Sequence, residues 1–239
     1  MKEKTLATLL ERIGTRYSEY LGINLDSGKD EEVFKWFLAS ILFGAPITET
    51  SVIRTYKLFE KHDVLTPTRI LETGWNSLVE ILDEGSYTRY DFKTADELLE
   101  VMRNLTEKYD GSLKLLYSKA SNSKDLENRL KDLAKGVGNV TVSIFLRELR
   151  ETCEKAKSNP TSLVVSAAKN LGIMNEETAE NALEQLEDFW EKNEVVGESF
   201  INFETALLKL GKDFCRKKKC ASCPVKNDCL NPKAFSHKL

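Results

Sequence analysis

Apolar residues recur every three or four positions along most of this chain, and no convincing run alternates apolar with polar residues as a strand would. Such a period is typical of amphipathic helices, which bury one stripe of their surface. We therefore predict an all-α protein. The predicted helices lie at about 34–42, 52–59, 67–72, 75–82, 93–109, 112–119 and 123–135, then after Pro160, around 176–192 and at about 200–210.

Glycine and proline mark several of the expected helix ends. The first of these helices should end near Gly44 and Pro46, because proline has no N–H to donate and its ring clashes with the preceding turn. The next should begin after Thr48. Further turns are expected at Gly74, Gly85 and Gly111. The segments 28–32 and 155–162 are the expected joints between domains.

Composition limits the class of protein. A chain of 239 residues can bury a substantial core as one large domain or as two intertwined smaller ones. Its 41% hydrophobic and 31% charged residues, with 12 Gly and 5 Pro, exclude collagen-like and disordered chains. The formal net charge of -3 exerts no overall attraction on nucleic acid. Any nucleic-acid binding must therefore come from local patches.

The start of the chain carries charges throughout and lacks the apolar core of a secretion signal. No apolar run approaches the roughly twenty residues that a membrane-spanning helix needs. We therefore expect a cytoplasmic protein without a membrane partner. Thiols are usually reduced in that compartment, so clustered cysteines indicate metal ligands rather than disulfides.

Four of the five cysteines lie close together near the end of the chain, at Cys215, Cys220, Cys223 and Cys229. Only the middle two form a C-x2-C pair, whereas a structural zinc site usually brings two such pairs from separate parts of a chain. Four thiols on one compact loop suit a 4Fe-4S cluster, whose irons take thiolate ligands. We predict this cluster, with zinc as the alternative. Cys153 stands apart and should be a small buried apolar residue.

A basic run separates the first two of these cysteines and consists of Arg216, Lys217, Lys218 and Lys219. Four thiolates on an oxidised 4Fe-4S core leave about two negative charges, which would repel DNA phosphate. The run offsets this charge and could present a positive face to a phosphate backbone. A solvated charge run that only compensates the cluster is an equally good interpretation.

Two glycines interrupt the helical pattern over 124–149, between a helix marked by Leu126, Leu130 and Leu133 and a second helix that begins at once. This is a helix-hairpin-helix pattern. Gly136 and Gly138 permit a tight turn with positive φ, and they remove side chains that would keep a phosphate from the backbone N–H groups. The dipole of the second helix points at the same place.

The hairpin is thus a predicted anion site that reads the DNA backbone rather than bases. Its predicted contacts are Gly136, Val137, Gly138, Asn139 and Thr141, where the threonine could help to satisfy the exposed helix start. The alternative is a helix corner in which glycine is needed only for the turn.

Three segments together resemble the endonuclease III-like branch of the helix-hairpin-helix DNA glycosylase superfamily. They are WFLASILFGAPITETSVIRTYKLFEK, LKDLAKGVGNVTVSIF and FETALLKLGKDFCRKKKCASCPVKNDC. The resemblance implies a two-lobed fold, with a six-helix domain over 30–150 and a second lobe made of 1–29 and 151–239 that is stapled by the cluster loop 215–229. It also implies double-stranded DNA in the cleft between the lobes and a role in base-excision repair, in which a damaged base is flipped out and its glycosidic bond is cleaved. We expect a monomer.

The chain departs from this family at both catalytic positions. Bifunctional members use a hairpin lysine as the attacking amine, but this chain has Val140 there. The family's downstream aspartate has no counterpart, since no aspartate occurs over 139–175, and Ser158 and Asn159 fall near its place. We therefore expect no lysine lyase activity, and we expect N-glycosylase chemistry to be altered or lost. A monofunctional glycosylase, which needs no lysine, is the one enzyme activity of the family that this chain could keep. The alternatives are a non-catalytic DNA binder and a structural or redox iron-sulfur protein that does not act on DNA.

Two earlier loops hold further candidates. Ile47 is the one plausible apolar wedge for the gap left by a flipped base. In the loop 85–95, Arg89 and Tyr90 could stack on an extruded base and Asp91 could be a displaced acid. Tyr90, Asp91 and Asn159 are accordingly the catalytic candidates. The pattern favours another arrangement, in which the loop's rings cap the core and Arg89 pairs with Asp91.

Three glutamates follow the hairpin and offer another source of a carboxylate: Glu148, Glu151 and Glu154. We expect them on a solvated helix face, where they would pair with neighbouring cations. Those cations are Arg147, Arg150 and Lys155.

Overall fold

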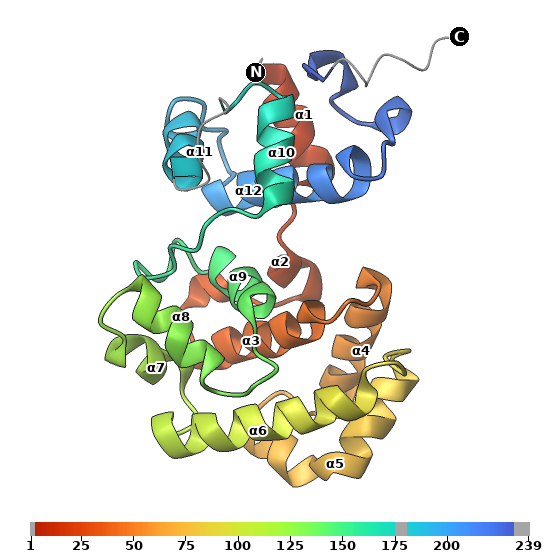
Figure 1. The fold of residues 1–239 in the computed structure, drawn as a ribbon, viewed down its shortest axis with the longest axis vertical. Coiled ribbons are helices and arrows are strands. Elements are labelled where there is room, and N and C mark those ends of the chain that lie inside the picture. The colour runs from red at the N-terminus through yellow and green to blue at the C-terminus, as the bar shows by residue number, and fades with distance from the viewer. Residues whose placement is uncertain (1–2, 175–180, 232–239) are drawn as a thin grey trace. The chain divides into compact units, whose positions relative to one another are not determined.

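The structure is a computed structural model that describes residues 3–174 and 181–231. Its regular elements are helical, with no strand in these ranges, so the predicted all-α class is confirmed (Figure 1). The chain forms two compact units, which we call the hairpin unit (Ser18–Ser158) and the cysteine unit (Met1–Tyr17 with Asn159–Leu239). One boundary thus precedes the expected joint at 28–32, and the other lies within 155–162. No helix in the described ranges is long and apolar enough to cross a membrane.

The hairpin unit is built around one central helix, α3 (Asp30–Gly44). The other elements of this unit are α2 (Tyr17–Leu21), η1 (Leu25–Ser27), α4 (Glu49–Lys61), α5 (Pro67–Glu84), α6 (Asp91–Tyr109), α7 (Leu113–Lys119), α8 (Ser123–Lys131) and α9 (Asn139–Arg147). Of these, η1, α4, α7 and α9 pack on α3, and α5 packs on α4 and α6. Residues on every side of α3 are buried, which is typical of a helix at the middle of a core. Trp36 of α3 donates its indole N–H to the Phe145 carbonyl of α9 at 3.1 Å, and the rings of Phe37 and Phe145 lie 4.8 Å apart. These contacts fix α9 against the core.

The end of α3 depends on a side chain from a distant loop. The Leu42 carbonyl would normally accept the N–H of residue 46, but that residue is proline and has none. The buried hydroxyl of Tyr87 donates to this carbonyl instead, at 2.6 Å. Tyr87 therefore closes the helix end that Pro46 leaves open, and α3 ends at Gly44 as predicted.

Some of the other predicted helix boundaries are correct and some are not. The helices predicted at 67–72 and 75–82 form one element, α5, which is interrupted by Gly74 with φ 71° and ψ 171°. The helix predicted to reach residue 135 ends at Lys131, because the chain turns into the hairpin earlier. The sequence pattern did not single out α1 (Glu3–Ile13) or α2.

The cysteine unit packs its helices on α12 (Phe200–Leu210), which is almost entirely buried. The other elements are α1, α10 (Ser162–Asn170), α11 (Ala182–Glu191) and the short turns η3 (Gly211–Cys215), η4 (Cys220–Ser222) and η5 (Lys226–Asp228). Phe203 of α12 stacks 5.6 Å from Phe189 and 5.5 Å from Trp190, both on α11. The helix predicted around 176–192 falls partly on residues 175–180, which lie outside the described residues.

The Tyr87 hydroxyl bond gives a test of the fold. We expect Tyr87→Phe to lower the free energy of unfolding by about 1–2 kcal/mol, because the buried Leu42 carbonyl loses its donor. Tyr20→Phe is the matched control, since Tyr20 is 62% exposed and should change stability little. Urea titration of both variants measures the difference. Equal stability of the two variants would contradict this account of the helix end.

Candidate functional site

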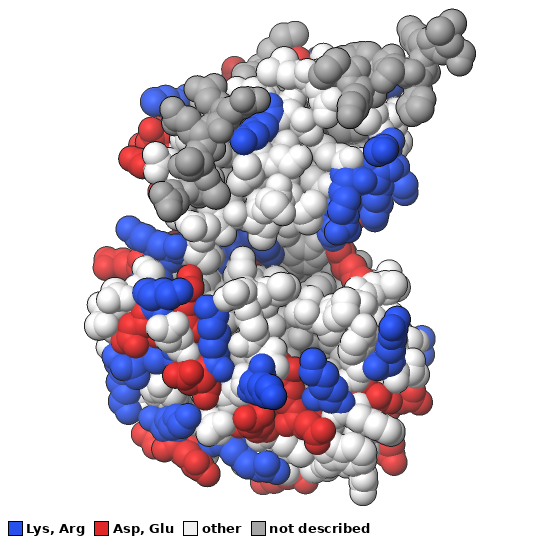
Figure 2. Space-filling view, in the orientation of Figure 1, with Lys and Arg blue, Asp and Glu red and all other residues white. Residues whose placement is uncertain are grey.

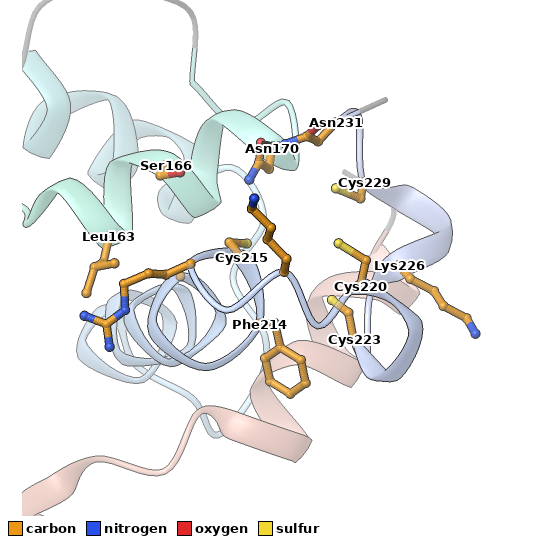
Figure 3. Close-up of a pocket in the computed structure, with 13 residues that line it drawn as sticks. Leu163, Ser166, Asn170, Phe214, Cys215, Cys220, Cys223, Lys226, Cys229 and Asn231 are labelled. Carbon is orange, nitrogen blue, oxygen red and sulfur yellow. Dashed lines mark hydrogen bonds between the residues drawn. The ribbon is translucent and has the colours of Figure 1, made fainter. Parts of the chain in front are cut away.

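The four clustered cysteines line one cavity in the cysteine unit, with a volume of about 690 Å³. Cys215 ends η3, Cys220 begins η4, Cys223 follows η4 and Cys229 follows η5, so the three short turns bring four thiols to the cavity. Figure 3 shows the thiols of Cys220, Cys223 and Cys229 projecting from the loop toward the side on which Cys215 lies. The residues 215–229, which we call the cysteine loop, therefore gather the predicted ligands around a common space.

Local constraints deliver the chain to this loop. The first turn, η3, is a π-helical turn that continues α12 directly. A Cβ on Gly211 would overlap the Leu163 carbonyl oxygen, so only glycine lets η3 pass so close to α10. Within the loop, Lys219 N–H donates to the Phe214 carbonyl at 2.9 Å, and Val225 is buried. Thr5 Oγ1 of α1 donates to Asp228 Oδ2 at 2.6 Å and fastens the loop's far side.

Asn170, at the end of α10, is a site residue that the sequence did not indicate. Its side chain hydrogen-bonds the Cys215 thiol. Its backbone carbonyl accepts the Leu230 N–H at 2.6 Å, and its Oδ1 accepts from Asn231 Nδ2 at 3.3 Å. One residue thus joins both ends of the cysteine loop. An isolated asparagine far upstream carries no spacing signal that could have revealed this.

The pKa values of two thiols in the cysteine loop are shifted by burial and by the neighbouring thiols. Burial raises the pKa of Cys215 and of Cys223, and the neighbouring thiols of the loop raise both further. The hydrogen bond from Asn170 works in the opposite direction and favours the thiolate of Cys215. In residues 3–174 and 181–231, no three His, Cys, Asp or Glu side chains are close enough together to hold a single metal ion.

The basic run of the cysteine loop is fully at the surface. Arg216, Lys217, Lys218 and Lys219 are all exposed. Lys217 Nζ lies 2.8 Å from Asp213 Oδ1, so its charge is partly neutralised. The other three have no ion-pair partner in the described part of the chain. Figure 2 shows Lys and Arg side chains gathered over this region, at the end of α12 and the cysteine loop.

The hairpin between α8 and α9 corrects one prediction. Neither Gly136 nor Gly138 has positive φ, and Gly138 is extended with φ -96° and ψ -175°. A Cβ on residue 136 would overlap the carboxylate of Glu97 on α6. At residue 138 the nearest atom to such a Cβ is the Gly136 carbonyl oxygen, 4.0 Å away. Gly136 therefore leaves room for the Glu97 side chain, whereas Gly138 leaves its own backbone uncovered.

The other predicted hairpin contacts divide between buried and exposed residues. Val137 is 2% exposed and Thr141 is 4% exposed, with the Thr141 hydroxyl against Gly44 of α3. The Thr141 side chain therefore packs inward instead of supporting the helix start. Asn139 is exposed and Val140 is 61% exposed at the first turn of α9. Gly138 precedes this helix without a side-chain cap, so the first N–H groups of α9 are open to an external acceptor.

The loop before α6 matches only half of the favoured prediction, in which its rings cap the core and Arg89 pairs with Asp91. Tyr87 does cap the core, but Arg89 and Asp91 form no ion pair in the described residues. Arg89 is exposed and lies over the Tyr90 ring at 5.9 Å. Asp91 Oδ1 instead accepts the Phe92 N–H at 2.7 Å, at the start of α6. The predicted Arg89–Asp91 pair is thus wrong, because the Asp91 carboxylate accepts a backbone N–H at the start of α6 instead.

The remaining candidates are scattered. Ile47 is half-buried and its N–H donates to the Ala45 carbonyl at 2.8 Å. Asn159 is exposed and belongs to the cysteine unit, whereas Tyr90 and Asp91 belong to the hairpin unit. Cys153 is half-buried instead of fully buried.

The glutamates after the hairpin do not share one solvated face. Glu148 is 1% exposed, so the expected solvated position is wrong for this residue. It accepts the Ser18 N–H at 3.0 Å and lies 3.9 Å from the guanidinium of Arg147, which is also buried. Glu151 and Glu154 are exposed as expected. The burial of Glu148 follows from packing at the end of α9, which the local pattern of charges does not encode.

No protein-family model matches the chain, and no curated protein matches it. Function must therefore be argued from the chemistry of these two sites, because a helical fold alone does not determine an activity.

Proposed function

We propose that this protein binds duplex DNA through its phosphate backbone and carries a 4Fe-4S cluster in the cysteine loop, as an altered member of the endonuclease III-like helix-hairpin-helix superfamily. The observation that carries the proposal is the pairing of four thiols around one cavity with an exposed basic run between the first two. The uncapped glycine hairpin supplies a second backbone-directed contact in the hairpin unit.

The four thiols of the cysteine loop fit such a cluster. All four line a common cavity and come from one compact loop, whereas a structural zinc site usually brings two C-x2-C pairs from separate parts of a chain. A cubane cluster takes one thiolate on each iron. Cys215, Cys220, Cys223 and Cys229 would hold it, with Asn170 donating to the first ligand. When bound, the cluster would supply a rigid scaffold and a negative charge.

The basic run gives the cysteine loop its DNA-binding character. Arg216, Lys218 and Lys219 are exposed, and each can offset cluster charge or contact a phosphate. Contacts of this kind release counterions, so the affinity they give must fall steeply with salt. The binding that we propose is accordingly directed at the backbone rather than at bases.

The hairpin contributes backbone N–H donors to the proposed DNA binding, but no catalytic side chain. Gly138 has no side chain to hold a phosphate away, and the first turn of α9 presents unsatisfied N–H groups beside it. Val140 occupies the exposed position where the family has its lysine, and an apolar side chain cannot attack a sugar carbon. We therefore propose a DNA-binding protein linked to base-excision repair that lacks lysine lyase activity, with N-glycosylase chemistry altered or lost.

Anaerobically purified protein should contain about four iron atoms per chain and absorb broadly near about 400 nm. Cys220→Ser should lose most of this iron and absorbance, because it removes a predicted ligand. Cys153→Ser is the matched control and should retain both, since Cys153 lies outside the loop. Iron analysis and visible spectra measure the effect. Stoichiometric zinc without visible absorbance would contradict the cluster.

The salt dependence of DNA binding tests the basic run. Replacing Arg216, Lys218 and Lys219 together by Gln should weaken duplex binding and reduce the slope of log affinity against log salt by about 2–3, at about 0.9 per phosphate contact. Lys217→Gln is the matched control within the same loop and should change the slope less, because Asp213 already neutralises part of its charge. Fluorescence anisotropy at several salt concentrations measures both. A triple variant with an unchanged slope would refute this contact.

The two hairpin glycines should respond differently to substitution. Gly138→Val has room in the folded hairpin and an extended backbone that valine tolerates, so it should leave the melting temperature nearly unchanged. It should still weaken DNA binding about tenfold, because its side chain covers the backbone donors. Gly136→Ala should displace the Glu97 side chain at a small cost in melting temperature. Wild-type affinity in Gly138→Val would exclude the hairpin as a phosphate site.

A further inference from the structure

Helix α6 runs beside the hairpin and contacts it at three successive points. Asn104 Nδ2 donates to the Leu133 carbonyl at 2.8 Å, and Lys108 Nζ lies 3.4 Å from the Asp132 carbonyl oxygen. Both side chains donate to carbonyls at the end of α8. The third contact is of the opposite kind, because Glu97 brings a carboxylate against Gly136. The helix thus places a negative group at the turn that we propose binds phosphate.

The surroundings of Glu97 do not neutralise this carboxylate. Two charged groups on its own helix, Lys93 and Glu100, change the pKa of Glu97. The charge of Glu97 in turn raises the pKa of Tyr87 in the preceding loop. In the described residues, neither Lys93 nor the exposed Lys135, which precedes Gly136 in the hairpin, forms an ion pair with Glu97. Burial raises the pKa of Glu97 to about 6, with Lys93 opposing and Glu100 reinforcing the shift.

We propose that Glu97 controls the phosphate affinity of the hairpin, weakening DNA binding when its carboxylate is charged and permitting it when the carboxylate takes up a proton. This inference rests on the proposed function of the hairpin. Its physical basis is repulsion between the carboxylate and a phosphate held at the Gly136–Gly138 turn, at a partly buried position where solvent screens little. Because the two anions oppose each other, DNA binding must in turn favour proton uptake by Glu97.

The sign of the pH dependence follows directly. Above pH 7 Glu97 is ionised and repels the phosphate, and below about pH 6 it becomes neutral. Duplex affinity should therefore rise as the pH falls through this range. The comparison is therefore made with a variant that differs from the wild type only at Glu97.

The decisive variant is Glu97→Gln, which keeps the shape of the side chain and removes its charge. At pH 7.5 we expect it to bind duplex DNA about three- to tenfold more tightly than the wild type, and at pH 5.5 the two should bind alike. The matched control is Glu100→Gln on the exposed side of α6, which removes an equal charge one turn away and should change affinity less than about twofold. Anisotropy titrations at both pH values measure these ratios.

Three outcomes decide the inference. Equal affinity of Glu97→Gln and wild type at pH 7.5, with salt-dependent DNA binding present in both, would overturn the role of Glu97 and leave the proposed function standing. Absence of duplex binding by the wild type at either pH would overturn both. The third measurement needs no variant: the wild-type amide resonances of Gly136 and Gly138 should titrate with a midpoint near pH 6, and a lack of titration would overturn the inference.

Discussion

The packing of α9 against α3 is the constraint on which the hairpin unit depends. Trp36 and Phe37 hold the last turn of α9 through Phe145. Thr141 then packs against Gly44 at the end of α3, and Tyr87 completes that end by reaching the Leu42 carbonyl. A glycine turn attached to a helix held in this way needs no unusual backbone angles, which explains why both hairpin glycines keep negative φ.

The cysteine unit obtains the same rigidity by other means. Its loop has only short turns of its own, so its shape depends on attachment to longer helices. Gly211 allows η3 to lie directly against α10, and Asn170 at the end of α10 holds both Cys215 and Leu230. The thiols are thus arranged by helices that carry no cysteine. A metal or cluster bound there would add to an existing scaffold instead of having to create one.

Local patterns predicted much of this molecule, and the failures share one cause. The apolar period located α6 almost to the residue, and cysteine spacing located the loop, because both signals lie within one continuous segment. The contact of Asn170 with Cys215, the approach of Glu97 to Gly136 and the hydrogen bond between Glu148 and Ser18 each join residues that are distant in sequence. A single sequence gives no pairing information between such residues, so their roles could be found only from packing. The positive φ predicted for the hairpin glycines failed for the same reason.

Under the proposed function, binding and catalysis place different demands on the hairpin. Backbone binding needs open N–H groups and a missing side chain, and both conditions are met at Gly138 as long as the fold is kept. Catalysis needs a particular functional group at a particular atom, and the exposed apolar side chain of Val140 offers none at the start of α9. A charged side chain that packs beside the hairpin, such as Glu97, can then change the proposed affinity for phosphate. Glu97 lies against Gly136, so the space left by the missing side chain also brings a titratable charge beside the proposed phosphate site.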